Sequence, residues 1–362
     1  MFINYLRNKI YKKFLFARQS WDTKNKYFKS FKFNHLNFTF REYGNKNPKK
    51  KFYVIRRHPG AGFFSNLCFV IHHLLICDNL KMIPIIDMEN YQTFYNCKKK
   101  IRGTYNSWEY FFKPVSNYTL NEVYQSKNVI ISDNRTSKKG FSKSNYNSEF
   151  KYLNGFQYFE KKHKKILDKY IKIHQDIKDK AAEIYKQFRN EKVMGICFRG
   201  SDQKRSAYQP HNPTEKQIKH ITDELIKKYK FNKIYLCTED EDYLKFYKKN
   251  YGDILIYSDS YRTTDKKDLF DNNKPDHRYK IGKGNLVDML VLSKTDYLLF
   301  STSNIPYTAI FFSNKNIPYA LIDNGIKGNI FVSQFSWFIR KNLPSFLGGF
   351  KNEYTEFKKN NS

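Results

Sequence analysis

Three polar clusters stand directly after short apolar runs in the second half of this 362-residue chain. They are Arg199-Gly200-Ser201-Asp202 after 193–198, Thr238-Glu239-Asp240 after 233–237, and Ser301-Thr302-Ser303-Asn304 after 297–300. An arginine holds a phosphate through forked, charge-assisted hydrogen bonds, and the free N–H groups at a helix start bind anions. The sequence of this half contains neither a glycine-rich phosphate loop nor an evident set of metal ligands. Arg199, Ser303 and the helix that Ser303 opens therefore indicate a diphosphate site without a metal ion.

Asp288 lies inside an apolar stretch with the sequence LVDMLVL. A carboxylate in such surroundings is costly unless it has a partner. Guanine presents its N1–H and N2–H donors side by side, and one carboxylate can accept both hydrogen bonds. The alternative is a carboxylate on a helix surface that faces solvent or pairs with a lysine.

Short apolar runs alternate with longer amphipathic stretches from about residue 52 onward. The runs predict strands at 52–55, 83–88, 128–132, 193–198, 233–237, 253–257, 297–300 and 318–322. The stretches predict helices at 66–80, 108–112, 160–189, 240–249, 284–293 and 303–312, and one more that Thr214 caps. This alternation predicts an α/β fold whose parallel sheets are covered by helices on both faces. Because such sheets bind ligands at the carboxyl ends of their strands, the three polar clusters would meet at one sheet edge.

The length of the chain suits two domains of ordinary size. We predict a basic, aromatic N-terminal arm over residues 1–50, a first α/β domain over 51–190, a second over 191–330 and a helical tail over 331–362. A loop of about 25 residues between Ser258 and Gly282 is long for a compact domain, which indicates function or mobility.

The 66 basic and 34 acidic side chains give a net charge of +32. Residues 1–60 hold 16 basic and two acidic side chains, a net +14, with many aromatic residues between them. Such a segment suits an anionic membrane surface, where charges meet headgroups and rings enter the interface. It also suits a nucleic acid, whose bases stack on aromatic rings, or it is simply a solvated arm.

Apolar stretches are too short or interrupted to cross a membrane, and the start of the chain lacks the continuous apolar run of a secretory signal. We therefore expect a cytoplasmic protein, bound peripherally to the inner face of a membrane if the arm binds lipid. Five widely spaced cysteines without a C-x-x-C pair suggest neither a disulfide framework nor a zinc site.

Several motifs resemble those of fucosyltransferases, especially the animal core α-1,6-fucosyltransferases and the rhizobial nodulation fucosyltransferases. The family's H-x-R-R-x-D motif is similar to 197–202, its His-Pro segment to 211–213, its YLATDD strand end to 235–240, and its LDIHFLSQADFLVCTFSS block to 287–304. In the first domain, 60–66 resembles the family's G-G-x-x-N-Q loop. The order and spacing of these motifs are more specific than any one of them.

This resemblance implies a GT-B-like fold, in which two Rossmann-like, doubly wound domains bind a GDP-sugar in the cleft between them. It implies an inverting glycosyltransferase that needs no metal ion or other cofactor and moves a sugar, most simply fucose, from the GDP-sugar to a hydroxyl. The expected compartment and the basic arm favour a glycan, polysaccharide or lipid-linked acceptor. The implied donor-binding residues are Gly62 and Asn66 in the first domain and Arg199, Asp240, Asp288, Ser303 and Asn304 in the second. Arg199 would hold the β-phosphate, and Asp288 would bind the guanine.

Inverting transfer needs a base for the acceptor proton and fixed positive charge for the departing diphosphate. Arg199 is the candidate for the charge. Asp202 is the first candidate for the base and His211 the second, although Asp202 could merely orient Arg199 and His211 could be an ordinary loop histidine. The sequence departs from the family pattern at Gly200, where the family has a second arginine, and near Ala207, where the core enzymes have their proposed base.

Two other functions fit parts of the sequence. The same scaffold could use another GDP-sugar such as GDP-heptose, because these motifs do not distinguish sugars that differ by one hydroxyl. A basic nucleic-acid-binding protein would explain the charge, but it would leave the polar clusters and Asp288 without a use. A nucleic acid is therefore the less favoured partner.

Overall fold

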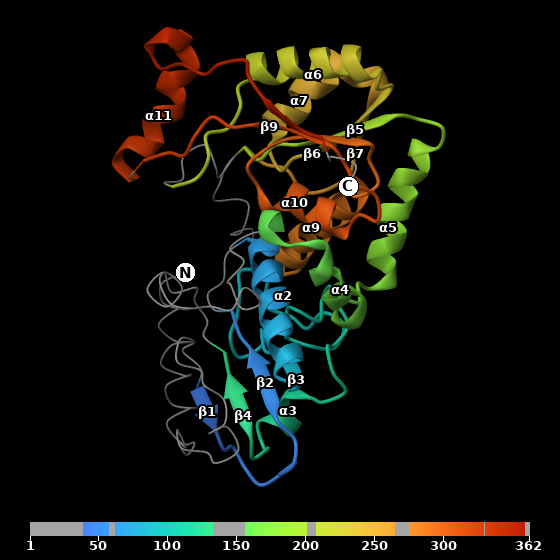
Figure 1. Ribbon diagram of the computed structural model, residues 1–362, viewed down its shortest axis with the longest axis vertical. Helices are drawn as coiled ribbons and strands as arrows, with labels where there is room; N and C mark the ends of the chain where they lie inside the picture. Colours follow the sequence, from blue (N-terminus) through green and yellow to red (C-terminus); the bar gives the residue numbers. More distant parts are fainter. Residues whose placement is uncertain are drawn as a thin grey trace. The chain divides into compact units, whose positions relative to one another are not determined.

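The computed structural model describes residues 39–57, 62–132, 156–200, 208–264, 275–328 and 330–358 (Figure 1). The chain divides into two compact units, one that ends at Ile173 and one that begins at His174. Each unit is built on its own β-sheet. The predicted α/β class with parallel strands in two Rossmann-like units is thereby confirmed, whereas the cleft between the domains stays a prediction.

The first unit contains a four-stranded sheet in the order β1-β4-β2-β3. Its strands are β1 (Thr39–Arg41), β2 (Phe52–Ile55), β3 (Ile83–Ile86) and β4 (Val129–Ile131). The last three are parallel, and β1 pairs with β4 in the antiparallel direction. Every residue of β2 is buried, as expected for a central strand of a parallel sheet. Its helices are α2 (Phe63–Asn79), α3 (Leu120–Val123) and α4 (Lys165–Tyr170), with 3-10 helices at Phe156–Tyr158 and Lys161–Lys164.

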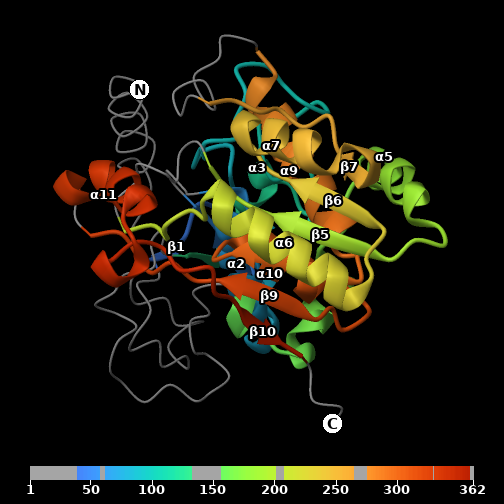
Figure 2. The same ribbon diagram turned by 90° about the horizontal axis from the view of Figure 1, so that it is seen from above.

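The second unit contains a six-stranded sheet in the order β10-β9-β8-β5-β6-β7 (Figure 2). Its strands are β5 (Val193–Cys197), β6 (Lys233–Cys237), β7 (Leu255–Tyr257), β8 (Tyr297–Ser301), β9 (Tyr319–Ile322) and β10 (Thr355–Phe357). All pairs are parallel except β9 with β10. The chain runs from β5 outward to β7, then returns to β8 on the other side of β5. The strand order therefore reverses between β5 and β8.

Helices cover this second sheet on both faces, as predicted (Figure 1). α6 (Glu215–Tyr229) and α7 (Glu241–Tyr251) lie on one face, where their apolar side chains join the main core of the unit. α9 (His277–Leu292) and α10 (Asn304–Phe312) lie on the opposite face. The remaining helices of the unit are α5 (Gln175–Tyr185), α11 (Ile330–Asn342) and 3-10 helices at Lys186–Phe188, Gly252–Ile254 and Ser345–Leu347. No described helix is long and apolar enough to span a bilayer.

The helix predicted over 160–189 is wrong as a single element, because the chain leaves the helical path after α4. The backbone at 171–174 pairs elsewhere: Ile173 forms a bridge with Phe112, and the Lys113 N–H donates to the Lys172 carbonyl. The following helix, α5, belongs to the second unit, where it packs against α9. The units therefore divide at 173/174, earlier than the predicted boundary at 190/191.

Three shorter predictions also differ from the structure. The predicted helix at 108–112 is only a hydrogen-bonded turn, in which the Phe112 N–H donates to the Trp108 carbonyl. The predicted N-terminal arm includes β1, which pairs with the sheet through residues 39–41. The predicted helical tail includes β10, which extends the second sheet at its β9 edge. Residues 1–38 of the arm lie outside the described residues.

Candidate functional site

Arg199 follows β5 next to the position where the strand order reverses. Ligands of open α/β sheets bind at this position, outside the carboxyl ends of the strands. The Arg199 side chain is 30 % exposed, and its Nε lies 3.8 Å from Oε1 of Glu239, which follows β6. The Asn212 side-chain amide donates a hydrogen bond to the Arg199 carbonyl. These contacts hold a partly exposed guanidinium at the edge where an anionic ligand is expected.

Glu239 is a further site residue, for which the sequence alone predicts no role. Its Oε1 accepts a hydrogen bond of 3.0 Å from the Gly200 N–H and also faces the Arg199 guanidinium. One carboxylate thus orients both the backbone and the side chain of the segment after β5. In the sequence, the only indication of a site role for Glu239 is its position directly after a predicted strand.

Gly200 stands where the resembled family has its second arginine, and the structure explains the glycine. A Cβ atom at this position would lie 1.8 Å from Oδ2 of Asp240, which is closer than any real contact. Asp240 is 1 % exposed and caps α7 by accepting hydrogen bonds from the N–H groups of Asp242 (2.8 Å) and Tyr243 (3.3 Å). The Asp240 carboxylate therefore supports a helix start beside the site, and position 200 has no space for a side chain.

Asp288 on α9 is 3 % exposed, so the solvent-facing alternative is wrong. The Tyr235 hydroxyl of β6 donates a 2.7 Å hydrogen bond to its Oδ1, and Ser258 and Ser260 also contact the carboxylate through hydrogen bonds. Burial raises the pKa of Asp288, while these hydrogen bonds and the charge of Arg262 oppose the rise. The buried carboxylate thus has hydroxyl partners rather than a lysine.

Arg262, after β7, adds a cation to the surroundings of Asp288 that sequence reasoning missed. Its Nη1 donates a 2.8 Å hydrogen bond to the Ser260 carbonyl. Its Nε and Nη2 are buried and have no hydrogen-bond partner. A buried N–H group without a partner is uncommon and costly, so these atoms are suited to an acceptor group of a bound ligand. The only sequence signal was that Ser258, Ser260 and Arg262 follow a predicted strand.

Ser303 is the N-cap of α10, as predicted, but its side chain makes no capping hydrogen bond. The first N–H groups of a helix have no partner within the helix, and they carry partial positive charge. Ser303 and Asn304 follow β8, whereas Arg199 follows the adjacent strand β5. The structure therefore places a cation and a helix start at the carboxyl ends of two neighbouring strands.

His211 is the second candidate for the base, and its surroundings are unfavourable to that role. It is 4 % exposed, its ring contacts Phe350, and its backbone N–H donates to the Gly325 carbonyl. Burial and the charges of Lys327 and Arg340 lower the pKa of His211 to about 4. The imidazole is therefore neutral near pH 7 and a weak base. Asp202, the first candidate, lies outside the described residues.

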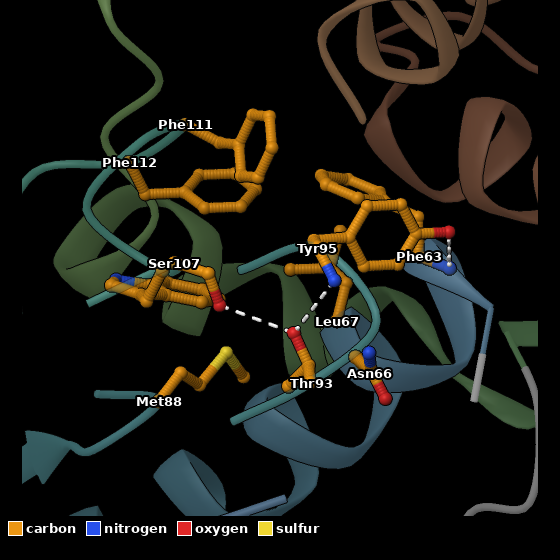
Figure 3. Close-up of a pocket in the computed structure, with 10 residues that line it drawn as sticks. Phe63, Asn66, Leu67, Met88, Thr93, Tyr95, Ser107, Phe111 and Phe112 are labelled. Carbon is orange, nitrogen blue, oxygen red and sulfur yellow. Dashed lines mark hydrogen bonds between the residues drawn. The ribbon is translucent and has the colours of Figure 1, made fainter. Parts of the chain in front are cut away.

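Asn66 and Gly62 belong to the first unit, where Gly62 is the N-cap of α2. The Asn66 N–H donates to the Gly62 carbonyl, and Nε of Arg57 donates a 3.3 Å hydrogen bond to Oδ1 of Asn66. Asn66 lines a small pocket with Phe63, and the other residues that line this pocket are mostly apolar (Figure 3). The structure thus brings these two predicted residues together at the start of one helix.

No group of three or more His, Cys, Asp or Glu side chains within the described ranges is arranged to hold a metal ion. Cys197 and Cys237 are neighbours on β5 and β6 with their sulfur atoms 3.7 Å apart, and both are free thiols.

No family model and no curated protein matches the chain. Among solved structures, it is similar to fucosyltransferase NodZ from Bradyrhizobium, at 14 % identity and a TM-score of 0.46 over 77 % of this chain and 99 % of that one. It is also similar to Arabidopsis thaliana FUT1 in complex with GDP, at 10 % identity and a TM-score of 0.43 over 78 % and 72 % of the two chains. A third similar structure is POFUT1 in complex with GDP-fucose, at 10 % identity and a TM-score of 0.39 over 77 % and 99 %. Solved structures to which this chain is similar thus include proteins that were crystallised with GDP or GDP-fucose.

Proposed function

We propose that this protein is a glycosyltransferase that moves a sugar, with fucose as the first candidate, from a GDP-sugar to a hydroxyl of a glycan or polysaccharide. The observation that carries this proposal is the grouping at one edge of the second sheet. Arg199 and the start of α10 lie on either side of the strand reversal, and the buried Asp288 carboxylate lies behind β6 and β7. A diphosphate suits Arg199 and the start of α10, and a purine with adjacent N–H donors suits the Asp288 carboxylate.

In the proposed reaction, Arg199 binds the β-phosphate and stabilises the negative charge that develops on GDP as the bond to the sugar breaks. Ser303 and Asn304 bind the phosphates or the ribose, and Asn66 and Gly62 of the first unit are further proposed donor-binding residues. Asp240 lies beside the nucleotide and holds the start of α7.

The acceptor hydroxyl attacks the anomeric carbon from the face opposite to GDP, through an oxocarbenium-like transition state, so the configuration inverts. Asp202 takes the acceptor proton, and His211 is the weaker alternative because of its low pKa. The proposal includes no metal ion, since Arg199 and the helix start supply the positive charge. A cytoplasmic location, at the inner face of a membrane, is part of the same proposal.

Another GDP-sugar, such as GDP-heptose, is the second candidate donor. The residues proposed to bind GDP are assigned to its phosphates, ribose and guanine, so they would serve either donor equally.

Thermal denaturation with added nucleotides tests the donor assignment. GDP should raise the melting temperature more than UDP does, with or without EDTA, because only GDP has the guanine that Asp288 is proposed to bind. A ligand at 100 times its Kd stabilises the native state by about 2.7 kcal/mol, which a melting curve detects. Asp288→Asn should weaken GDP binding about tenfold and leave UDP binding nearly unchanged, since it removes an acceptor for one guanine N–H.

Arg199→Ala should abolish sugar transfer and leave the melting temperature of the free protein nearly unchanged. Turnover of that variant at the wild-type rate would overturn the role of Arg199. Equal responses to GDP and UDP would overturn the role of Asp288, and loss of the GDP response in EDTA would overturn metal independence.

A further inference from the structure

The C-terminal part of the second unit exposes an unusual set of large apolar side chains. Within thirteen residues, six of them are at least 36 % exposed, and Phe346 reaches 83 %. We call this set the α11 patch, and it consists of Phe335, Phe338, Ile339, Leu343, Phe346 and Leu347. Exposed apolar side chains gathered in this way mark interaction sites, whereas isolated ones are ordinary.

The helix that carries the patch is fixed to its unit by the opposite side. Trp337 is 6 % exposed, and its indole N–H donates a 2.7 Å hydrogen bond to the Asn212 carbonyl. Arg340 donates to the carbonyls of Asn324 and Gly348. In both views α11 stands to one side of the helices that cover the sheet (Figures 1 and 2). The patch is therefore held outward by specific contacts.

The segment that carries the patch has charges of one sign. Between Asp323 and Glu353 the sequence contains no acidic residue and four basic ones. Lys327 is 1 % exposed and Arg340 is hydrogen-bonded on the side of α11 that faces the unit, so Lys341 and Lys351 supply the exposed positive charge. Lys341 is exposed in the last turn of α11, and its ammonium lies 5.2 Å from the centre of the Trp337 ring. Apolar rings beside basic side chains match the two layers of an anionic bilayer surface, the acyl boundary and the headgroups.

A second copy of the chain fits this surface less well. Two patches facing each other would bring basic segments together, and each copy has a net charge of +32. Like-charge repulsion opposes such a dimer, whereas the same charge favours an anionic membrane.

We propose that the α11 patch is a membrane-docking surface, which inserts its Phe and Leu side chains into the interface of an anionic bilayer while Lys341 binds headgroups. This surface is distinct from the basic N-terminal arm, to which the sequence analysis assigned a membrane contact. The inference does not depend on the proposed sugar transfer.

Flotation of the full chain with phospholipid vesicles tests this surface. The wild-type protein should float with vesicles that contain one third phosphatidylglycerol in phosphatidylcholine, and much less with phosphatidylcholine alone. Replacing Phe346→Ser together with Leu347→Ser should lower the partition coefficient roughly tenfold or more, because two inserted side chains are lost. Lys341→Glu should weaken binding to the anionic vesicles only.

Matched controls separate the patch from general effects. Tyr105→Ser removes an aromatic side chain that is 41 % exposed in the first unit, and Lys227→Glu makes the same charge change on α6. Both controls should bind vesicles as the wild type does. Wild-type binding by the double variant, or no flotation of the wild type, would overturn the proposal. A dimer in light scattering that the double variant abolishes, without vesicle binding, would assign the patch to a second copy instead.

Discussion

At the scale of single residues, Gly200 shows how a motif is altered by a residue distant in sequence. The sequence suggested that one positive charge of the family's arginine pair is missing there. In the structure, the Asp240 carboxylate occupies the space that a side chain at position 200 would need. Glycine therefore replaces the family's second arginine because the segments after β5 and β6 pack closely at this position.

Gly200→Ala should lower the free energy of unfolding by about 1–2 kcal/mol, because the new Cβ displaces Asp240 from the cap of α7. It should also weaken GDP binding, since the Arg199 segment must move. Urea denaturation and the GDP-induced thermal shift measure the two effects. Gly252→Ala is the matched control, because a Cβ at Gly252 meets no atom within 4 Å. Equal stability of the two variants would contradict this role of Gly200.

The positions of several candidate site residues could be predicted from sequence because those residues follow a strand directly. Arg199, Asp240 and Ser303 were predicted from that position, and each lies at a strand end or helix start. The partners of Asp288 could not be predicted, because Tyr235 is 53 residues away and its hydroxyl is one of many in the sequence. Arg262 follows a predicted strand, but nothing in the sequence shows that its charge lies near Asp288.

At the scale of elements, one carboxylate adds several contacts to the pairing that joins β10 to the second unit. Glu356 accepts hydrogen bonds from Nζ of Lys228 (2.8 Å) and from the hydroxyls of Tyr229 (2.7 Å) and Tyr297 (2.9 Å). Although burial opposes it, these hydrogen bonds keep the pKa of Glu356 below its usual value. A strand of only three residues at a sheet edge depends on such contacts.

Glu356→Ala should lower the free energy of unfolding by about 1–3 kcal/mol at pH 7, because the buried Tyr297 loses its acceptor. Since the folded-state pKa of Glu356 is lowered, its contribution is present above the unfolded pKa of about 4.3 and is lost as the pH falls below it. The difference from wild type should therefore shrink in acid. Urea denaturation at pH 7 and below pH 4 tests this, and Glu353→Ala, with a side chain 74 % exposed, should change little. A constant difference at both pH values would contradict it.

Hydrophobic patterns predicted the parallel strands of both sheets well, because each of these strands lies in a short, mostly apolar run. The 160–189 prediction failed because apolar residues at helical spacing continue across 171–174 while the backbone there pairs with residues 112–113. β1 and β10 were missed because Thr39–Arg41 and Thr355–Phe357 each contain only one apolar residue, whereas the equally short edge strand β7 is apolar throughout. An apolar run thus decides which strands a pattern indicates.

At the scale of the whole molecule, α5 decides where the second unit begins. Ile177, Ala181 and Ile184 of α5 are buried, and Lys283 of α9 forms a 3.0 Å ion pair with Asp176. α9 in turn carries Asp288. A unit that begins at residue 191 would leave this face of α9 exposed, although its sheet would be complete.

A fragment of residues 174–362 should therefore unfold cooperatively and be stabilised by GDP, whereas a fragment of residues 191–362 should be less stable by roughly 4 kcal/mol. The estimate counts two isoleucines at about 1.5–3 kcal/mol each and a small term for the alanine. Because domains of this size are stable by only about 5–15 kcal/mol, the shorter fragment should be largely unfolded at modest urea concentrations. Circular dichroism in urea compares the fragments, and Lys283→Ala in the longer one separates the ion pair from the apolar contact. Equal urea midpoints would show that α5 is a linker, while a stable longer fragment without a GDP response would leave the unit boundary intact and count against the donor site.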